Sequence, residues 1–283
     1  MALATHRALQ ASGVKVTASA PGSGPYALAA TADALIEGEV NLGSTLFTTL
    51  VVTGYQHAYE NIYRKPGDFY EAAYAPGIEN LLPSLQPLDT LFSKGKLPST
   101  QLFSSVPPAP QYASMTPPTS PPLTPPSLTP VFAAGFGNAN LVRNAYRLSL
   151  LEDASANPDG AFPNSTVALT PAANPMHPLR QAFKRNDLRN WLPRAPVLLC
   201  GGGSDPTVFF FNASHRAGLL AERQSAGRAH VRAGRGLSDL RAQRSVRAHQ
   251  AGFRKCEGDT RESGRSGRCN RRWRLGCASG LSR

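Results

Sequence analysis

Residues 195–212, APVLLCGGGSDPTVFFFN, predict a short strand that ends in a sharp turn. Four apolar residues, 197–200, lie between a proline and three glycines, a pattern typical of a strand buried on both faces of a parallel sheet. The glycines let the chain turn and leave Asp205 just past the carboxyl end of the strand, where open α/β sheets hold ligands and catalytic groups. The sequence therefore predicts a site at Asp205. The alternative is that Asp205 and Pro206 only open a turn, since both residue types favour turns.

A second segment, residues 14–26 (VKVTASAPGSGPY), is a β-branched run closed by proline, glycine and serine. It follows residues 2–11, whose apolar positions at 3, 4, 8 and 9 predict a helix. The predicted order is therefore a helix, a strand, a long excursion and a second strand with an aspartate at its end.

With these two motifs in this order, residues 1–213 resemble the α/β-hydrolases, and among them the secreted lipase and esterase group of bacteria and fungi. In that group a strand ending like APGSGPY follows the nucleophile helix, and a large helical cap is inserted. The next strand ends in a GG-x-x-D-P-x-V phrase that carries the acid of the triad. The resemblance implies a serine hydrolase of small-molecule or lipid carboxylic esters, with Asp205 as the acid and no cofactor. A peptidase of the same fold is a close alternative.

The nucleophile and the base of such a triad are not evident in the sequence. No G-x-S-x-G elbow occurs, and Ser23 and Ser204 are only partial imitations of one. We therefore expect the chain to begin just downstream of the nucleophile and to lack the loops that donate to an oxyanion. The intact relatives are expected to be secreted or periplasmic, so a signal peptide would be missing here with the N-terminal portion.

In the α/β-hydrolase order the histidine follows the acid. The later histidines are His215, His230 and His249, and all of them fall in a compositionally unusual tail. For the earlier histidines, which are His6, His57 and His177, we expect solvated or capping roles. With neither serine nor base, we expect the chain to show no measurable esterase activity.

The resemblance implies an α/β fold with a partial hydrolase sheet, and the residue patterns predict a large helical cap and a disordered basic C-terminal tail. The divisions are residues 1–30 (core remnant), 31–193 (cap), 194–213 (acid strand) and 214–283 (tail). Within the cap, residues 106–130 are rich in proline and predict an extended surface segment. Helices are expected at residues 31–39, 42–63, 69–75, 77–82, 87–93, 138–154 and 179–191.

Three finer expectations concern side chains of the cap. Asp68 is expected to cap the helix at 69–75, and residues 141, 145 and 148 to form the inner face of the helix at 138–154. An aromatic stripe favours packing between cap and core, and a groove for an acyl chain is the alternative. Its members are Tyr55, Tyr59, Tyr63, Phe69, Tyr70 and Tyr74.

The net charge of +12 is confined to the tail. Residues 1–213 hold 13 basic and 13 acidic residues, whereas 214–283 hold 17 and 5, with 16 of the 17 being arginine. All 25 prolines lie before the tail. This abrupt change is typical of GC-rich DNA translated in a shifted frame, which is our hypothesis for residues 214–283. The alternative is a polyanion binder, acting on nucleic acid or anionic lipid through the arginines.

The remaining signals are negative. The spacing of Cys256, Cys269 and Cys277 matches no metal motif, and Cys200 is expected to be a small buried apolar residue. No apolar run is long enough to cross a bilayer, and no signal peptide opens the chain. We therefore expect no metal, no specific nucleic-acid partner and no transmembrane segment.

Overall fold

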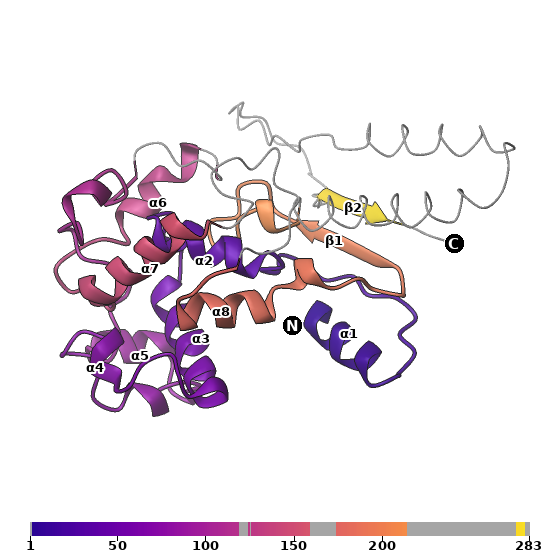
Figure 1. The fold of residues 1–283 in the computed structure, drawn as a ribbon, viewed down its shortest axis with the longest axis horizontal. Helices are drawn as coiled ribbons and strands as arrows, with labels where there is room; N and C mark the ends of the chain where they lie inside the picture. The colour runs from indigo at the N-terminus through magenta and orange to yellow at the C-terminus, as the bar shows by residue number, and fades with distance from the viewer. Residues whose placement is uncertain (1, 119–123, 125, 159–173, 214–275, 281–283) are drawn as a thin grey trace, which may run out of the picture.

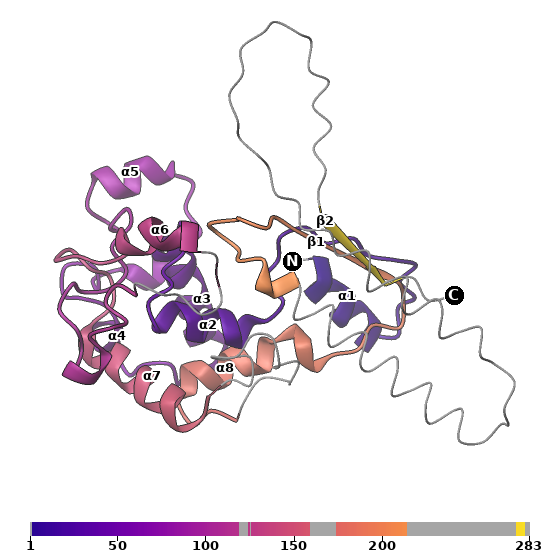
Figure 2. The same cartoon turned by 90° about the horizontal axis from the view of Figure 1, so that it is seen from above.

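The computed structural model describes residues 2–118, 124, 126–158 and 174–213, together with the backbone of 276–280. In both views the helices α2 to α8 gather in one body, and α1 and β1 lie beside it (Figures 1 and 2). The α-helices are α1 (Ala2–Ala11), α2 (Leu28–Ile36), α3 (Ser44–Tyr59), α4 (Pro66–Phe69), α5 (Leu88–Ser93), α6 (Thr129–Ala133), α7 (Asn144–Ala156) and α8 (Pro178–Asn186). The 3₁₀ turns are η1 (Ile78–Asn80), η2 (Pro110–Tyr112), η3 (Pro126–Leu128) and η4 (Leu188–Asn190).

The strand β1 (Val197–Gly201) forms where the sequence predicts it, and the segment before α2 runs parallel to it. The N–H of Ser19 donates to the carbonyl of Pro196 at 3.0 Å, and the N–H of Leu198 donates to the carbonyl of Ser19 at 2.9 Å. The expected strand at 14–26 is nevertheless reduced to isolated bridges at Ser19 and Gly22. Proline at position 21 has no N–H to donate, so a regular ladder cannot continue through this segment.

The other edge of β1 pairs antiparallel with β2 (Gly276–Gly280), so the described strands form a two-stranded sheet rather than a parallel hydrolase sheet. Burial alternates along β1, and the expectation of a strand buried on both faces is wrong. Cys200 is half-buried and disulfide-bonded, not the buried apolar residue expected. The expectation of a disordered tail is wrong for residues 276–280, and the rest of 214–283 lies outside the described residues.

The helices agree best with expectation where the local pattern is strong. The helix α1 has the expected bounds, whereas α3 and α7 are shorter than expected at one or both ends.

Asp68 does not cap a helix at 69–75. It lies in the first turn of α4, and its carboxylate accepts the N–H groups of Arg64 and Lys65, both at 3.2 Å.

A large apolar cluster lies within the helical body, and a smaller one joins α1 to β1. The described part of residues 106–130 does not only cross the surface, because Tyr112 is buried in the large cluster and Leu128 in a third cluster with Phe132 and Phe209. No helix in the described residues has the length and apolarity that a bilayer crossing requires.

Candidate functional site

Asp205 lies four residues beyond the last residue of β1, in the turn that the glycines open. Its Oδ1 accepts the N–H of Thr207 at 2.9 Å and the N–H of Val208 at 3.0 Å. Asp205 therefore has the turn role that the alternative interpretation predicts. Among the described residues nothing hydrogen-bonds Oδ2 of this half-buried carboxylate, so one oxygen is fixed by the backbone and the other is open to a donor.

The loop that carries Asp205 is tied to the segment between α2 and α3. The side-chain amide of Asn41 donates to the carbonyl of Thr207, and the N–H of Leu42 donates to the carbonyl of Pro206 at 2.9 Å. These bonds fix the residues directly after Asp205 against the N-terminal end of α3. The sequence pattern gave no signal for this contact, because the partners are about 165 positions apart.

Neither of the serines considered from the sequence meets a described imidazole. Ser23 is exposed, and its φ of 40° lies in the left-handed region that non-glycine residues rarely adopt. Its N–H donates to the carbonyl of Cys200 at 2.8 Å, which holds it beside the end of β1. Ser204 is exposed in the turn before Asp205. Both hydroxyls are near the end of β1, but the geometry does not assign either of them as a nucleophile.

His6 pairs with a serine that sequence reasoning missed. Its Nδ1 lies 2.9 Å from Oγ of Ser19, between α1 and the segment bridged to β1. The ring is 3% exposed and meets the ring of Trp191 edge-on, with 5.0 Å between the centroids. Burial lowers the pKa of His6 below 6.5. The expectation of a solvated or capping role for His6 is therefore wrong, because it is an internal contact of α1.

The capping role expected of a histidine is found at His177. Its Nδ1 accepts the N–H of Leu179 at the start of α8, so in the neutral ring Nε2 carries the proton. That nitrogen lies 3.3 Å from Oγ of Ser149, whose own proton goes to the carbonyl of Tyr146. His177 therefore acts as a donor here and not as a base. His57 is exposed on α3, and His215, His230 and His249 lie outside the described residues.

Buried charges link α2, α7 and α8. Arg180 donates from Nε to Asp33 at 2.8 Å and from Nη1 to Asp153 at 2.7 Å, and all three side chains are less than a tenth exposed. Burial and the nearby carboxylates of Asp33 and Glu39 raise the pKa of Glu37 to about 8. Perturbed carboxyl groups mark functional sites in many proteins, but these lie in helix contacts, and we interpret them as structural.

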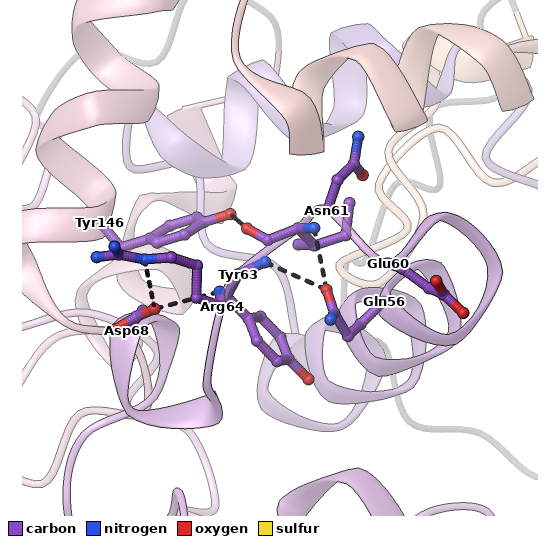
Figure 3. Close-up of a pocket in the computed structure, with 8 residues that line it drawn as sticks. Gln56, Glu60, Asn61, Tyr63, Arg64, Asp68 and Tyr146 are labelled. Atoms are coloured by element: carbon purple, nitrogen blue, oxygen red, sulfur yellow. Dashed lines mark hydrogen bonds and ion pairs between the residues drawn. The ribbon is translucent and has the colours of Figure 1, made fainter.

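A cleft of about 670 Å³ opens at the C-terminal end of α3 (Figure 3). Arg64 and Asp68 lie at one end of it, and Gln56 and Glu60 lie at the other. Tyr146 also lines the cleft, and its hydroxyl donates to the carbonyl of Ile62 at 2.7 Å. The sequence analysis did not predict this cleft. Asp205 does not line this cleft. Its lining residues are Gln56, Glu60, Asn61, Ile62, Tyr63, Arg64, Asp68 and Tyr146.

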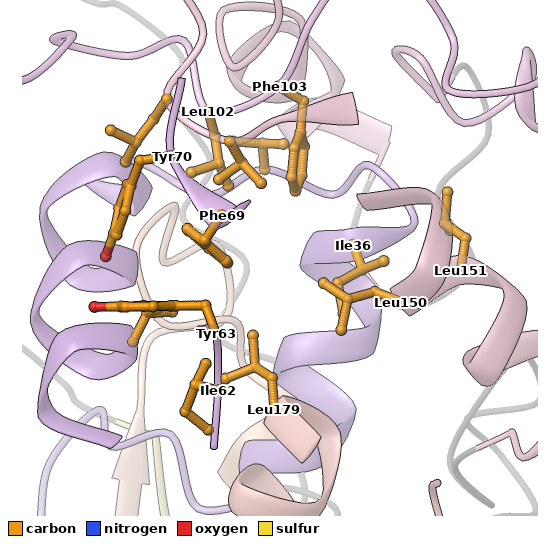
Figure 4. Packing of buried hydrophobic residues seen from close by; sticks show 14 of the residues in the cluster. Ile36, Ile62, Tyr63, Phe69, Tyr70, Leu102, Phe103, Leu150, Leu151 and Leu179 are labelled. Atoms are coloured by element: carbon orange, nitrogen blue, oxygen red, sulfur yellow. The ribbon is translucent and has the colours of Figure 1, made fainter. Parts of the chain in front are cut away.

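The aromatic stripe packs into the large apolar cluster, whose residues all fall within 35–183, so it packs inside the expected cap and the prediction of packing between cap and core is wrong. Tyr63 and Tyr70 lie edge to face, and Phe69 meets Tyr70 with 4.6 Å between ring centroids (Figure 4). Tyr63 also donates to Glu79 at 2.9 Å, and burial raises its pKa. Tyr55, Tyr59 and Tyr74 are partly buried against the same cluster.

Comparison with solved structures identifies an esterase-like fold. A ligand-bound form of the rice cell wall degrading esterase LipA from Xanthomonas oryzae aligns with 78% of this chain at 25% identity and a TM-score of 0.50. A point mutant of the same esterase aligns with 79% at 26% identity and a TM-score of 0.50. That esterase is a hydrolase of the α/β-hydrolase type, and this chain spans 45% of its length. No protein-family model and no curated protein sequence matches this chain.

Proposed function

We propose that this chain is built on the plan of a serine hydrolase of carboxylic esters, with Asp205 in the place of the triad acid. The observation that carries the proposal is the setting of its carboxylate, which follows β1, has Oδ1 fixed by two amides and has Oδ2 open. A triad acid needs one such open oxygen, because it accepts the N–H of the histidine and stabilises the imidazolium. The likeness to an esterase supports the same plan.

The proposal extends to the division of the chain. Residues 31–193 would form the cap, and residues 1–30 and 194–213 would belong to the hydrolase core. Relatives of the same plan would be exported, and residues 214–283 would derive from a shifted reading frame. The composition of the tail supports the last point. Reading the coding DNA in the other two frames tests it, since the correct frame should continue an α/β pattern that contains a histidine.

For the chain as it stands, we expect no turnover of a short-chain nitrophenyl ester above the rate in buffer. Among the described residues no imidazole contacts Asp205, and binding alone provides little catalysis. The measurement is an ester assay of the full chain beside its Asp205→Ala variant. Turnover in the parent chain that the variant lost would contradict the expected inactivity, although it would support the acid role.

A graft tests the acid role separately. Residues 195–213 of this chain would replace the corresponding segment of the Xanthomonas oryzae esterase. We expect the graft to hydrolyse esters and its Asp205→Asn variant to lose about 10⁴-fold in kcat, as triads do when the acid cannot set the histidine tautomer. The matched control is Ser204→Ala in the same graft, which should keep its activity. An Asp205→Asn variant as active as the unmodified graft would rule out the acid role.

A further inference from the structure

The turn after α2 holds a carboxyl group among other carboxylates. Glu37 follows the last residue of α2, and it is half-buried. Among the described residues, the charged groups that face it are Asp33 on α2, Glu39 in the turn and Arg180 on α8. All three are nearly fully buried, and the guanidinium of Arg180 is shared between Asp33 and Asp153 of α7. A negative charge at Glu37 is therefore unfavourable, because it loses hydration and is repelled by two carboxylates.

The backbone is fixed on both sides of Glu37. Its N–H donates to the carbonyl of Asp33 at 2.9 Å, and Arg147 on α7 donates to the carbonyl just before it at 3.1 Å. Gly38 follows with a φ of 110° and packs so closely against the carbonyl oxygen of Met115 that a Cβ would not fit. A small movement of the backbone therefore cannot carry the carboxyl of Glu37 into solvent. The turn has to open as a whole.

Residues 38–42 connect this turn directly to the loop that carries Asp205. The side-chain amide of Asn41 donates to the carbonyl of Thr207, and the N–H of Leu42 donates to the same loop at 2.9 Å. Both donors lie within five positions of Glu37 along the chain. Opening of the turn would therefore displace the groups that hold the loop.

We propose that ionisation of Glu37 opens the turn after α2 and loosens the Asp205 loop, so that the loop is held more firmly at acidic than at alkaline pH. In the closed turn, burial and the facing carboxylates raise the pKa of Glu37 to about 8, whereas an open, solvated turn restores the ordinary value of 4.5. The open turn therefore gains population as the pH rises between these two values, and the gain ends above about pH 8. The proposal concerns how the loop is held, and it does not require Asp205 to be a catalytic acid.

Amide hydrogen exchange of the full chain at about pH 6 and about pH 8, corrected for the intrinsic exchange rates, tests the proposal. In the parent chain, protection of residues 204–210 should fall about tenfold or more between the two values, since the linkage allows at most about tenfold for each pH unit. Glu37→Gln keeps the size of the side chain and cannot ionise, so its protection should be the same at both values. The matched control is Glu60→Gln, an exposed glutamate just after α3, which should behave as the parent does.

Four outcomes would overturn the proposal. Equal protection of the parent loop at both pH values would show that the Glu37 side chain ionises without opening the turn. A Glu37→Gln variant that keeps the pH dependence would show that another group causes it, and so would a Glu60→Gln variant that loses it. A fall in protection of the same size in α3 and α7 would show global unfolding. The readout is amide exchange, so an esterase-inactive chain can support the proposal and an active one can contradict it.

Discussion

At Arg180 a single guanidinium joins three helices. The residue lies on α8, its carboxylate partners come from α2 and α7, and it also donates to the carbonyl of Asn157 at 3.0 Å. Replacing it with Met would leave Asp33 and Asp153 buried without their counter-ion. Breaking a buried pair in this way costs about 3–5 kcal/mol of unfolding free energy. Urea denaturation of the Arg180→Met variant should show a loss of this size.

The exposed pair between Arg64 and Asp68 provides the control for this prediction. Its guanidinium is 97% exposed and lies 3.9 Å from the carboxylate, so solvent screens the interaction. Arg64→Met should change the free energy of unfolding by less than about 0.5 kcal/mol. Equal losses at Arg64 and Arg180 would show that burial does not determine the contribution of these arginines.

His6 makes the docking of α1 dependent on pH. Burial places its folded-state pKa below 6.5, so the folded state favours the neutral ring. Its contribution to stability is then complete above the unfolded pKa and is lost as the pH falls through 6.5 towards the folded value. In His6→Asn, the difference in unfolding free energy from the parent should shrink below pH 6.5. The control for the loss of a histidine is His57→Asn, because His57 is exposed on α3.

At the scale of elements, the turn after α2 depends on a glycine. Gly38 has a φ of 110°, and a Cβ there would collide with the carbonyl oxygen of Met115 and with Pro118. Gly38→Ala should cost about 2 kcal/mol or more, because both the backbone and the contact are strained. Gly67→Ala in α4 is the matched control, since its Cβ would meet open space and its φ is not left-handed. Thermal unfolding of both variants measures the difference, and equal shifts would contradict the prediction.

The helices α1 and α7 show where sequence patterns predict structure and where they do not. The helix α1 could be predicted with its bounds, because it is a local run without proline or glycine. The prediction of the inner face of α7 was wrong, because the side chain at the centre of that face is Arg147, which is fully buried. Its guanidinium donates to the carbonyls of Ile36 and Met115 and lies 4.4 Å from the ring centroid of Phe103. A pattern that assigns arginine to the surface cannot predict a position stabilised by distant carbonyls and rings.

For the whole molecule, the parallel direction of residues 19–22 and β1 was predictable from two short motifs, and so was the position of Asp205 after β1. The contacts that assemble the helical body were not. Asp33 and Arg180 are 147 positions apart, and nothing local in either segment indicates the other. The same holds for Asn41 and the loop after Asp205. The position of Asp205 after β1 could thus be predicted from sequence, but the contacts that hold its loop could not.

The uneven core predicts that the molecule opens in parts. The helical body contains a cluster of 19 buried apolar residues, whereas the cluster that joins α1 to β1 contains six, including Leu3 and Leu199. Leu3→Ala removes a large side chain from the small cluster and should cost about 2–3 kcal/mol. Because the small cluster contributes less burial, the loss should appear as local opening of α1 and β1 before the helical body unfolds. Native-state hydrogen exchange should show faster exchange in these two elements and unchanged protection in α3 and α7. Leu150→Ala, in the large cluster, should instead lower protection throughout, and a uniform loss in Leu3→Ala would show a single cooperative unit.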